Sequence, residues 1–459
     1  MMQGGLIQPN MRVAVLGFGL SGQAAMEFAL AAGASVRVSD SGDQAKFAAR
    51  HGARLDALGL PWEAGRHTDQ FLANIDAAII SPGVSLHQSA MKTLRNRGVP
   101  CYGELALAAP LLAAPVVAVT GTNGKTTVTT LIGEILTAAG KKVFVGGNIG
   151  TPLLRHILAG QRVDVIVLEL SSFQLQLAGD FAPQIGVLLN ITPDHFDLHA
   201  DMAEYAAAKM RLFARQKKDD TAVICLDDPV AASLTAAIPS RLVGYGSQTD
   251  NQNCQVILQP HMVRYSQRGR EEVYDLSGSA LDFPIGLSNG AAAIGATRAF
   301  GIEAETILTT LRAFTPLPHR LQLVRRLNGV RYVDDSKGTN TGAVIAALRQ
   351  TPGRVALIAG GRHKGEDYRL LREAVAAHCR HLILIGEAAP LLAEALTGFA
   401  PITIAGDMGE ATRIAAALAE PGDTVLLSPA CSSFDMFKDY AERGQRFAAA
   451  VQALPGGTR

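Results

Sequence analysis

The run TGTNGKTT at residues 120–127 has the residue types of a phosphate-binding loop. It follows the apolar run VVAVT and precedes a helix that we expect over residues 127–139. Glycines let backbone N–H groups close around phosphate oxygens, and the N-terminal end of a helix dipole favours the same anion. Lys125 would reach the β- and γ-phosphates, and the Thr126 hydroxyl would bind Mg²⁺. The sequence therefore predicts a nucleoside triphosphate site at Gly121, Thr122, Asn123, Gly124, Lys125, Thr126 and Thr127.

This loop is the shorter GxxGKTT form, because Val119 stands where the longer motif has a glycine. An ordinary strand-to-helix turn with an exposed lysine is the competing interpretation. A phosphate loop alone also leaves the protein class open, since kinases, GTPases, transport ATPases and ligases all bind nucleotides in this way.

Carboxylate and histidine side chains follow two further apolar runs. Glu169 closes the run at residues 163–168, and the carboxyl end of a buried parallel strand is where such sheets bind ligands. Its oxygens suit Mg²⁺, although a carboxylate near Ser171 could instead cap a helix. The loop NITPDHFDLH at residues 190–199 offers His195 as a site residue. Lys209, within AKMRLF, looks by itself like a solvated helix lysine.

A second glycine-rich run, GFGLSG at residues 17–22, follows an apolar strand, and Asp40 comes 18 residues after Gly22. This spacing is typical of a dinucleotide-binding oxidoreductase. A purely structural role for Gly22, which would allow close packing of helix on strand, is the other alternative. An oxidoreductase would leave the phosphate loop downstream unexplained.

The elements that position these residues alternate between apolar strands and helical patterns, which predicts an α/β protein with parallel sheets. The length of 459 residues favours about three domains, which we expect at residues 1–112, 113–317 and 318–459. All three would be α/β domains, and the second would contain the phosphate loop. Residues 245–280 suggest short antiparallel strands or loops, and an alanine-rich helix is expected after Asn289.

The composition excludes several classes of function. The net charge is +1, so no basic footprint for nucleic acid is present. The most apolar stretch, residues 104–120, is interrupted by prolines and a glutamate and is too short for a membrane span. Five scattered cysteines without a CxxC pair favour a reducing compartment. We therefore expect a soluble, cytoplasmic protein. We also expect a monomer.

Together these motifs closely resemble those of the Mur ligases. The resemblance rests on GTNGKTT, the loop at residues 190–199, DDSKGTN at residues 334–340 and LSPACSSFDMFKDY at residues 427–440, and it extends from residue 17 to residue 444. It implies an N-terminal Rossmann-like domain that holds a UDP-sugar, a central P-loop ATPase-type domain that holds ATP and a C-terminal Rossmann-like domain that brings the amino acid. The last passage is similar to that of members that add D-glutamate to UDP-N-acetylmuramoyl-L-alanine. In that reaction ATP phosphorylates the substrate carboxylate, and the amine of D-glutamate then attacks the acyl phosphate.

The resemblance also implies roles for individual residues. Thr126 and Glu169 would hold one Mg²⁺, and His195 and a carbamylated Lys209 would hold a second. The catalytic residues would be Lys125, Glu169, His195 and Lys209. Nucleotide contacts beyond the loop would come from Asn289, Arg320 and Asp335. Contacts to the UDP-linked substrate would come from Leu20, Ser21, Gly22, Asp40, Ser81, Gly83, Asn148, Gln174 and His195. D-glutamate would be bound by Lys337, Thr339, Lys364, Ser433 and Tyr440.

Two positions depart from the family pattern, and other ligases remain open. Ala292 replaces a frequent asparagine, and Tyr440 stands where phenylalanine is common. Another Mur-type ligase, for L-alanine or a diamino acid, or a folylpolyglutamate-type ligase is the alternative within the class. The DNPR motif of the diamino-acid members is absent from residues 428–439. A regulatory P-loop protein is the alternative outside the class, but it would not need a second metal site.

Overall fold

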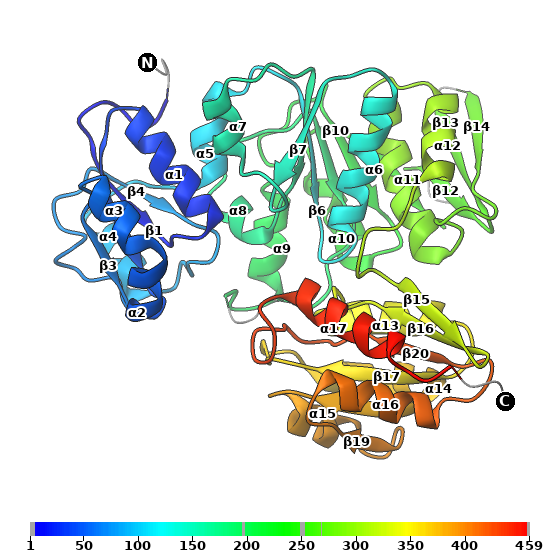
Figure 1. Cartoon of the computed structure of the whole chain (residues 1–459). Coiled ribbons are helices and arrows are strands. Elements are labelled where there is room, and N and C mark those ends of the chain that lie inside the picture. The colour runs from blue at the N-terminus through cyan, green and yellow to red at the C-terminus, as the bar shows by residue number, and fades with distance from the viewer. Residues whose placement is uncertain (1–4, 195–197, 248–252, 268, 457–459) are drawn as a thin grey trace. The chain divides into compact units, whose positions relative to one another are not determined.

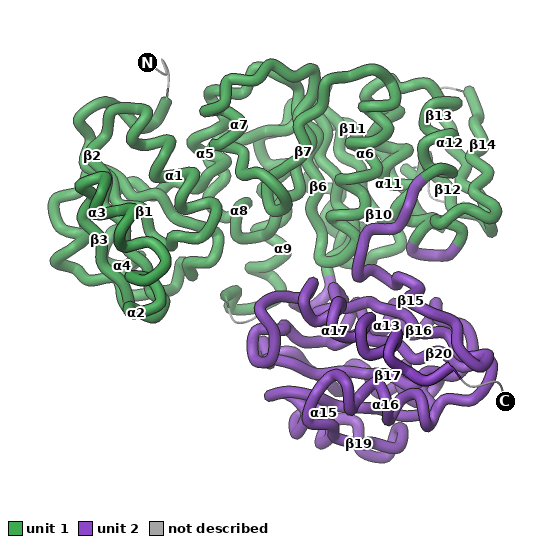
Figure 2. The backbone as a smooth tube through the Cα atoms, in the orientation of Figure 1, with its two compact units in different colours: residues 1–191, 198–282, 286–313 green, residues 192–197, 283–285, 314–459 purple. Residues whose placement is uncertain are grey.

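The computed structural model describes residues 5–194, 198–247, 253–267 and 269–456. Strands and helices alternate along most of this length (Figure 1), which confirms the predicted α/β class. The chain forms two compact units (Figure 2). Unit 1 contains residues 1–191, 198–282 and 286–313, and unit 2 contains residues 192–197, 283–285 and 314–459.

Unit 1 begins with a five-stranded parallel sheet in the order β3-β2-β1-β4-β5, the strand order of a Rossmann fold. Alternate residues of β1 belong to different apolar clusters: Val13 and Val15 to one, Ala14 and Leu16 to another. Both faces of the sheet are therefore buried, as its continuous apolar strands predict. The strands are β1 (Arg12–Leu16), β2 (Ser35–Asp40), β3 (Trp62–Ala64), β4 (Ala77–Ile80) and β5 (Cys101–Tyr102).

The second sheet of unit 1 has nine strands in the order β14-β13-β12-β11-β10-β9-β6-β8-β7. It is parallel from β7 to β12, and the pairs β12–β13 and β13–β14 are antiparallel, which confirms the antiparallel strands expected in residues 245–280. The strands are β6 (Val116–Thr120), β7 (Val143–Gly147), β8 (Val165–Glu169), β9 (Ile185–Leu188), β10 (Thr221–Cys225), β11 (Arg241–Gly246), β12 (Cys254–Gln259), β13 (Met262–Gln267) and β14 (Arg270–Asp275).

Unit 2 contains a six-stranded sheet in the order β15-β16-β20-β17-β18-β19, in which only β15 runs antiparallel to its neighbour within the described residues. Alternate residues of β17 again pack into separate clusters on the two faces of the sheet. The strands are β15 (Gln322–Leu327), β16 (Val330–Asp334), β17 (Val355–Gly360), β18 (Cys379–Ile385), β19 (Ile402–Ile404) and β20 (Thr424–Leu427).

The α-helices as far as residue 313 are α1 (Leu20–Ala31), α2 (Gln44–Phe47), α3 (Ala53–Ala57), α4 (Ser89–Asn96), α5 (Glu104–Ala108), α6 (Lys125–Ala138), α7 (Leu153–Ala159), α8 (Ser172–Gln176), α9 (Met202–Met210), α10 (Pro229–Ser233), α11 (Pro284–Ala299) and α12 (Ala304–Ala313). Those of unit 2 after residue 313 are α13 (Thr341–Gln350), α14 (Arg372–His378), α15 (Ala389–Leu396), α16 (Met408–Leu418) and α17 (Tyr440–Gln452).

Two helix starts were predicted wrongly. Helix α6 begins at Lys125 rather than at residue 127, because Gly124 adopts a left-handed conformation and ends the loop just before it. Helix α11 begins at Pro284, before Asn289, because the fixed φ of proline suits the first position of a helix. Asn289 therefore lies inside the helix rather than ahead of it.

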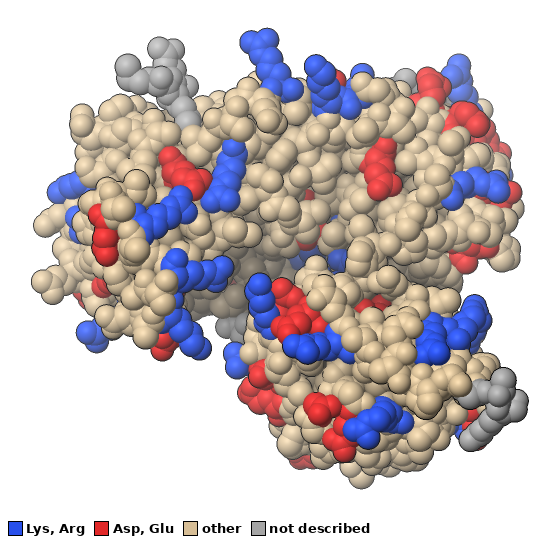
Figure 3. Space-filling view, viewed as in Figure 1, with Lys and Arg blue, Asp and Glu red and all other residues tan. Residues whose placement is uncertain are grey.

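The surface agrees with the nearly balanced charge of the chain. On the face in Figure 3, Lys and Arg side chains are interspersed with Asp and Glu, as expected at a net charge of +1. Among the residues that the structure describes, no helix is long and apolar enough to cross a membrane.

Candidate functional site

The phosphate loop joins the end of β6 to the start of α6. Gly124 has φ of 85°, a left-handed conformation that costs glycine little and other residues much more. The first hydrogen bond within the helix runs from the Val128 N–H to the Gly124 carbonyl. The N–H groups of residues 125–127 therefore do not bond within the helix, and Lys125, Thr126 and Thr127 present the donors of an anion site.

Asn190, two residues after β9, forms hydrogen bonds that hold the first half of this loop; we call them the Asn190 brace. Its Oδ1 accepts hydrogen bonds from the backbone N–H of Thr122 at 3.1 Å and of Asn123 at 2.8 Å. Its Nδ2 donates to the Asn123 carbonyl at 3.1 Å. The brace fixes the shape of the loop and engages two N–H groups that the sequence assigned to phosphate.

Lys125 and Asn289 both lie at this loop. The Lys125 Nζ donates to the carbonyls of Gly121 at 3.0 Å and Thr122 at 2.8 Å. A Cβ placed on Gly124 would lie 2.7 Å from Oδ1 of Asn289, so this side chain from α11 covers the loop. The structure thus brings together all the predicted nucleotide residues of unit 1, whereas the departing residue Ala292 is fully buried in the core.

Glu169 has the environment of a metal ligand. It ends β8 beside Val119, the last residue but one of β6, and is only 2% exposed. Its Oε1 accepts a hydrogen bond from Asn148 Nδ2 at 2.7 Å, while its Oε2 is buried without a hydrogen-bond partner among the described residues. A buried carboxylate oxygen without a donor fits a hard cation such as Mg²⁺. No group of three or more His, Cys, Asp or Glu gathers as a metal cluster in the ranges that the structure covers.

Lys209 is not a solvated helix lysine, because it is 1% exposed and its side chain reaches the phosphate loop. Its Nζ donates to the Gly121 carbonyl at 2.8 Å and lies 4.3 Å from the ring centroid of Tyr205. The Tyr205 hydroxyl lies 3.1 Å from Oγ1 of Thr122. His195, the other residue predicted for the second metal, lies outside the described residues.

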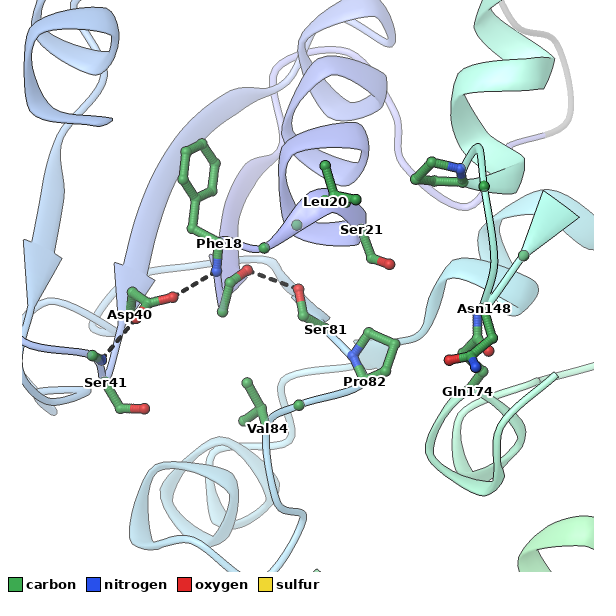
Figure 4. A pocket seen from close by; sticks show the side chains of 18 residues that line it. Phe18, Leu20, Ser21, Asp40, Ser41, Ser81, Pro82, Val84, Asn148 and Gln174 are labelled. Carbon is green, nitrogen blue, oxygen red and sulfur yellow. Dashed lines mark hydrogen bonds between the residues drawn. The ribbon is translucent and has the colours of Figure 1, made fainter. Parts of the chain in front are cut away.

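A cavity of about 570 Å³ in unit 1 is lined by every residue predicted to bind the UDP-linked substrate except His195 (Figure 4). One wall is the glycine-rich run and the start of α1, and Asn148 and Gln174 lie opposite it. The residues brought together are Leu20, Ser21, Gly22, Asp40, Ser81, Gly83, Asn148 and Gln174. The N-terminus of a twelve-residue helix at this cavity suits a diphosphate.

The glycine-rich wall is held by its own side chains. Asp40 accepts hydrogen bonds from the N–H groups of Phe18 and Gly42, both at 2.7 Å, and the Ser81 hydroxyl donates to the Gly17 carbonyl at 2.7 Å. A Cβ on Gly22 would lie 2.0 Å from the Gly17 oxygen, so no side chain fits there. The close packing proposed for Gly22 is present, and it coexists with a place on the cavity wall.

Arg320 and Asp335, predicted for the nucleotide, both belong to unit 2. Asp335 follows β16, and its carboxylate accepts a hydrogen bond from the Ser428 hydroxyl at 2.7 Å. Burial raises the pKa of Asp335 to about 7, and the hydrogen bond from Ser428 and the charge of Arg320 oppose that rise.

This raised pKa predicts a pH dependence of stability that Asp335→Asn removes. In the folded protein the carboxyl keeps its proton up to about pH 7, whereas in the unfolded chain it ionises near its ordinary pKa of 3.8. The folded state therefore binds more protons in this window, and its stability falls as the pH rises from about 4 to about 7. The melting temperature of Asp335→Asn minus that of the wild type should increase across this window and level off above it. A difference that stays constant from pH 4 to 8 would contradict the assignment.

The residues predicted for D-glutamate all belong to unit 2; Tyr440 begins α17, and the others lie on loops. Lys337 Nζ is 4.0 Å from the ring centroid of Tyr440, which is a cation–π contact. Lys364 Nζ donates to Oδ1 of Asp194 at 3.0 Å. The Arg362 N–H and the Ser432 carbonyl pair the loop of Lys364 with the loop of Ser433 at 2.9 Å. Thr339 is half-buried two residues after Lys337.

Sequence reasoning missed several residues that shape these sites. Asn190, Tyr205 and Asp194 were passed over, although Tyr205 lies one helical turn before Lys209 and Asp194 immediately precedes His195. Arg443 gave no signal, yet it is completely buried. It donates to the Ser336 hydroxyl and carbonyl at 3.0 and 2.8 Å and to the Cys431 carbonyl at 3.1 Å.

Profiles of three protein-family domains match successive parts of the chain. Residues 11–103 match the Mur ligase MurD-like N-terminal domain, residues 119–293 the Mur ligase middle domain and residues 319–431 the Mur ligase glutamate ligase domain. Together they cover the first sheet of unit 1, the second sheet from the end of β6 onwards, and most of unit 2.

Curated relatives match over nearly the full length. A UDP-N-acetylmuramoylalanine–D-glutamate ligase of Desulfotalea psychrophila is 48% identical over 450 residues, which is 98% of this chain and 97% of the relative. The enzyme of the same name from Geotalea uraniireducens is 41% identical over 98% of both chains.

Solved structures share the fold at low sequence identity. A pseudomurein peptide ligase type C from Methanothermus fervidus has a TM-score of 0.60 at 18% identity, over 97% of this chain and 100% of that one. The MurF ligase of Thermotoga maritima in complex with ADP has a TM-score of 0.60 at 19% identity, over 97% and 96%. The three domain profiles and the 48% identical relative settle the family, and the chain belongs to the Mur ligases.

Proposed function

We propose that this chain is an ATP-dependent ligase that adds D-glutamate to UDP-N-acetylmuramoyl-L-alanine in peptidoglycan precursor synthesis. Both curated relatives described above are named UDP-N-acetylmuramoylalanine–D-glutamate ligase, and each match covers 98% of this chain. One structural observation carries the proposal. Asn148, on the wall of the substrate cavity, donates at 2.7 Å to Glu169. The proposed metal carboxylate therefore adjoins both that cavity and the strand before the phosphate loop.

The geometry suggests how the chain's own residues serve this reaction. A substrate held in the cavity would extend its alanyl carboxylate past Asn148 towards the γ-phosphate at the loop. Lys125 and the helix N-terminus would neutralise that phosphate, a task of positioning and electrostatics. Mg²⁺, when bound by Thr126 and Glu169, would supply further charge neutralisation. The carboxylate oxygen forms a bond to phosphorus as ADP leaves; the amine of D-glutamate then attacks the acyl carbon, phosphate departs and the amine loses a proton.

Release of ADP tests the proposal. We expect release that depends on both UDP-N-acetylmuramoyl-L-alanine and D-glutamate. ATP hydrolysis that is indifferent to both substrates would favour a regulatory P-loop protein, and turnover with another amino acid would favour a different ligase. Oxidation of NADH would revive the dinucleotide interpretation of residues 17–22.

We also propose that Lys209 acts as its carbamate, which turns a buried cation into a metal-binding carboxylate. Lys209→Ala is then expected to lower turnover about 100-fold, and high concentrations of formate or acetate should restore part of it. Lys125→Ala is the matched control, because the group lost there is a cation and an added carboxylate cannot replace it. Normal folding without any recovery in Lys209→Ala would count against the carbamate.

Three further features remain proposals: the domain boundaries, the monomeric state and the cytoplasmic location. The proposed domains 1–112, 113–317 and 318–459 each contain one of the three sheets. We also propose a cytoplasmic location, which the scattered cysteines favour, and a monomeric state.

A further inference from the structure

Two carboxamides lie opposite the glycine-rich wall of the substrate cavity, Asn148 and Gln174 (Figure 4). A carboxamide can present either its N–H or its oxygen to a ligand, and only its other contacts decide which. The other hydrogen bonds of each carboxamide therefore decide whether it presents a donor or an acceptor to the cavity.

Gln174 has its orientation fixed by Ser171. Its Oε1 accepts hydrogen bonds from the Ser171 N–H at 3.0 Å and the Ser171 hydroxyl at 3.1 Å. A backbone N–H can only donate, so the oxygen of the carboxamide must face it. The Nε2 group accordingly faces Glu104, to whose Oε2 it donates at 3.5 Å. One of its two hydrogens is used in this way, and the second can be donated to a ligand.

Glu104, on α5, lies behind the cavity and is 5% exposed. Its Oε1 accepts a hydrogen bond from the Leu154 N–H at 3.1 Å, at the start of α7, and its Oε2 faces Gln174. Burial raises the pKa of Glu104, and its bonds to Leu154 and Gln174 lower it. The two oxygens therefore do separate tasks: one satisfies a helix end, and the other holds the carboxamide of Gln174.

Asn148 is held in the opposite sense. Its Nδ2 donates to Glu169 at 2.7 Å, so its oxygen is the end left for the cavity. An N–H from Gln174 beside a C=O from Asn148 complements a secondary amide, which carries one acceptor and one donor. UDP-N-acetylmuramoyl-L-alanine carries such amides.

We propose that Glu104 is a positioning residue for the UDP-linked substrate, which it serves by holding the N–H of Gln174 towards an amide of that substrate. The inference rests on the proposed function. Glu104 itself does not line the cavity, so its effect must pass through Gln174.

Glu104→Gln tests this directly, because the new carboxamide can still accept from Leu154 but then turns a donor towards the Nε2 donor of Gln174. We expect the Kd for UDP-N-acetylmuramoyl-L-alanine, measured by calorimetry, to rise about tenfold. The kcat and the KM for D-glutamate should stay within about twofold. Glu134→Gln, which removes an exposed carboxylate on α6 away from this cavity, is the control and should leave the Kd unchanged.

A double-mutant cycle separates positioning from a merely structural role. In a Gln174→Ala background, Glu104→Gln should change the Kd by less than about twofold, because the group through which it acts is gone. If Glu104→Gln raised the Kd by the same factor with and without Gln174, the inference would be overturned. If Glu104→Gln fails to fold, Glu104→Asp keeps the charge but withdraws it from Gln174; it should weaken binding, and a wild-type Kd would overturn the inference. Failure of the wild-type chain to bind the UDP-linked substrate would instead refute the proposed function.

Discussion

Replacing Lys125 by alanine is expected to reduce the turnover number about 1,000-fold while the fold stays intact. The ammonium group lies over the phosphate loop, bonded to two loop carbonyls, where the terminal phosphates of a nucleotide would lie. Removing it leaves the charge that develops on the transferred phosphoryl group without its main counter-ion. The free energy of unfolding should change little, because the Lys125 side chain is only half-buried and Asn190 holds the loop independently.

The measurement is ADP release with both substrates at saturation, together with the melting temperature. Lys141→Ala removes an exposed lysine just after the same helix and should leave both quantities unchanged. Near-normal turnover in Lys125→Ala would refute the assignment of residues 120–127 to the nucleotide.

Arg443→Ala is expected to destabilise unit 2 by about 3 kcal/mol and to weaken the binding of D-glutamate. The guanidinium is completely buried, and burial lowers its pKa to about 10, so it remains charged at neutral pH. It joins the loop of Ser336 to the loop of Cys431, and the neighbouring residues of these loops are those predicted for D-glutamate. Its removal leaves buried acceptors without donors and a void between the loops.

Thermal unfolding should show a melting temperature lower by about 5–10 °C, and the KM for D-glutamate, measured well below that temperature, should rise. Arg446→Ala is the matched control on the same helix, since its side chain is 66% exposed and its ion pair among the described residues is with Glu442. A loss of stability in Arg443→Ala no greater than in Arg446→Ala would contradict the structural role.

The sequence could predict those parts of the site that are formed by consecutive residues. The phosphate loop and the glycine-rich run each join an apolar strand to a helix, so their chemistry and their position at a sheet edge follow together. Glu169 could be predicted from its place after the last apolar residue of β8. The parallel sheets follow from strands that are apolar on both faces.

The remaining contacts join residues far apart in the chain without any periodic pattern. Asn190 bonds to residues 67 and 68 positions away, and Glu104 lies 70 positions from Gln174. Arg443 reaches Ser336 across 107 positions. Each of these polar side chains would be typical of a surface if judged by its neighbours in sequence. They are buried because the fold brings distant segments together, and local sequence propensity does not determine those long-range contacts.

The hydrogen bonds of Asn190 to the phosphate loop have a thermodynamic consequence for nucleotide binding. The side chain of Asn190 already holds residues 122 and 123 in one conformation, so nucleotide binding does not have to immobilise them. Less chain entropy is then lost on association, and more of the contact energy appears as affinity.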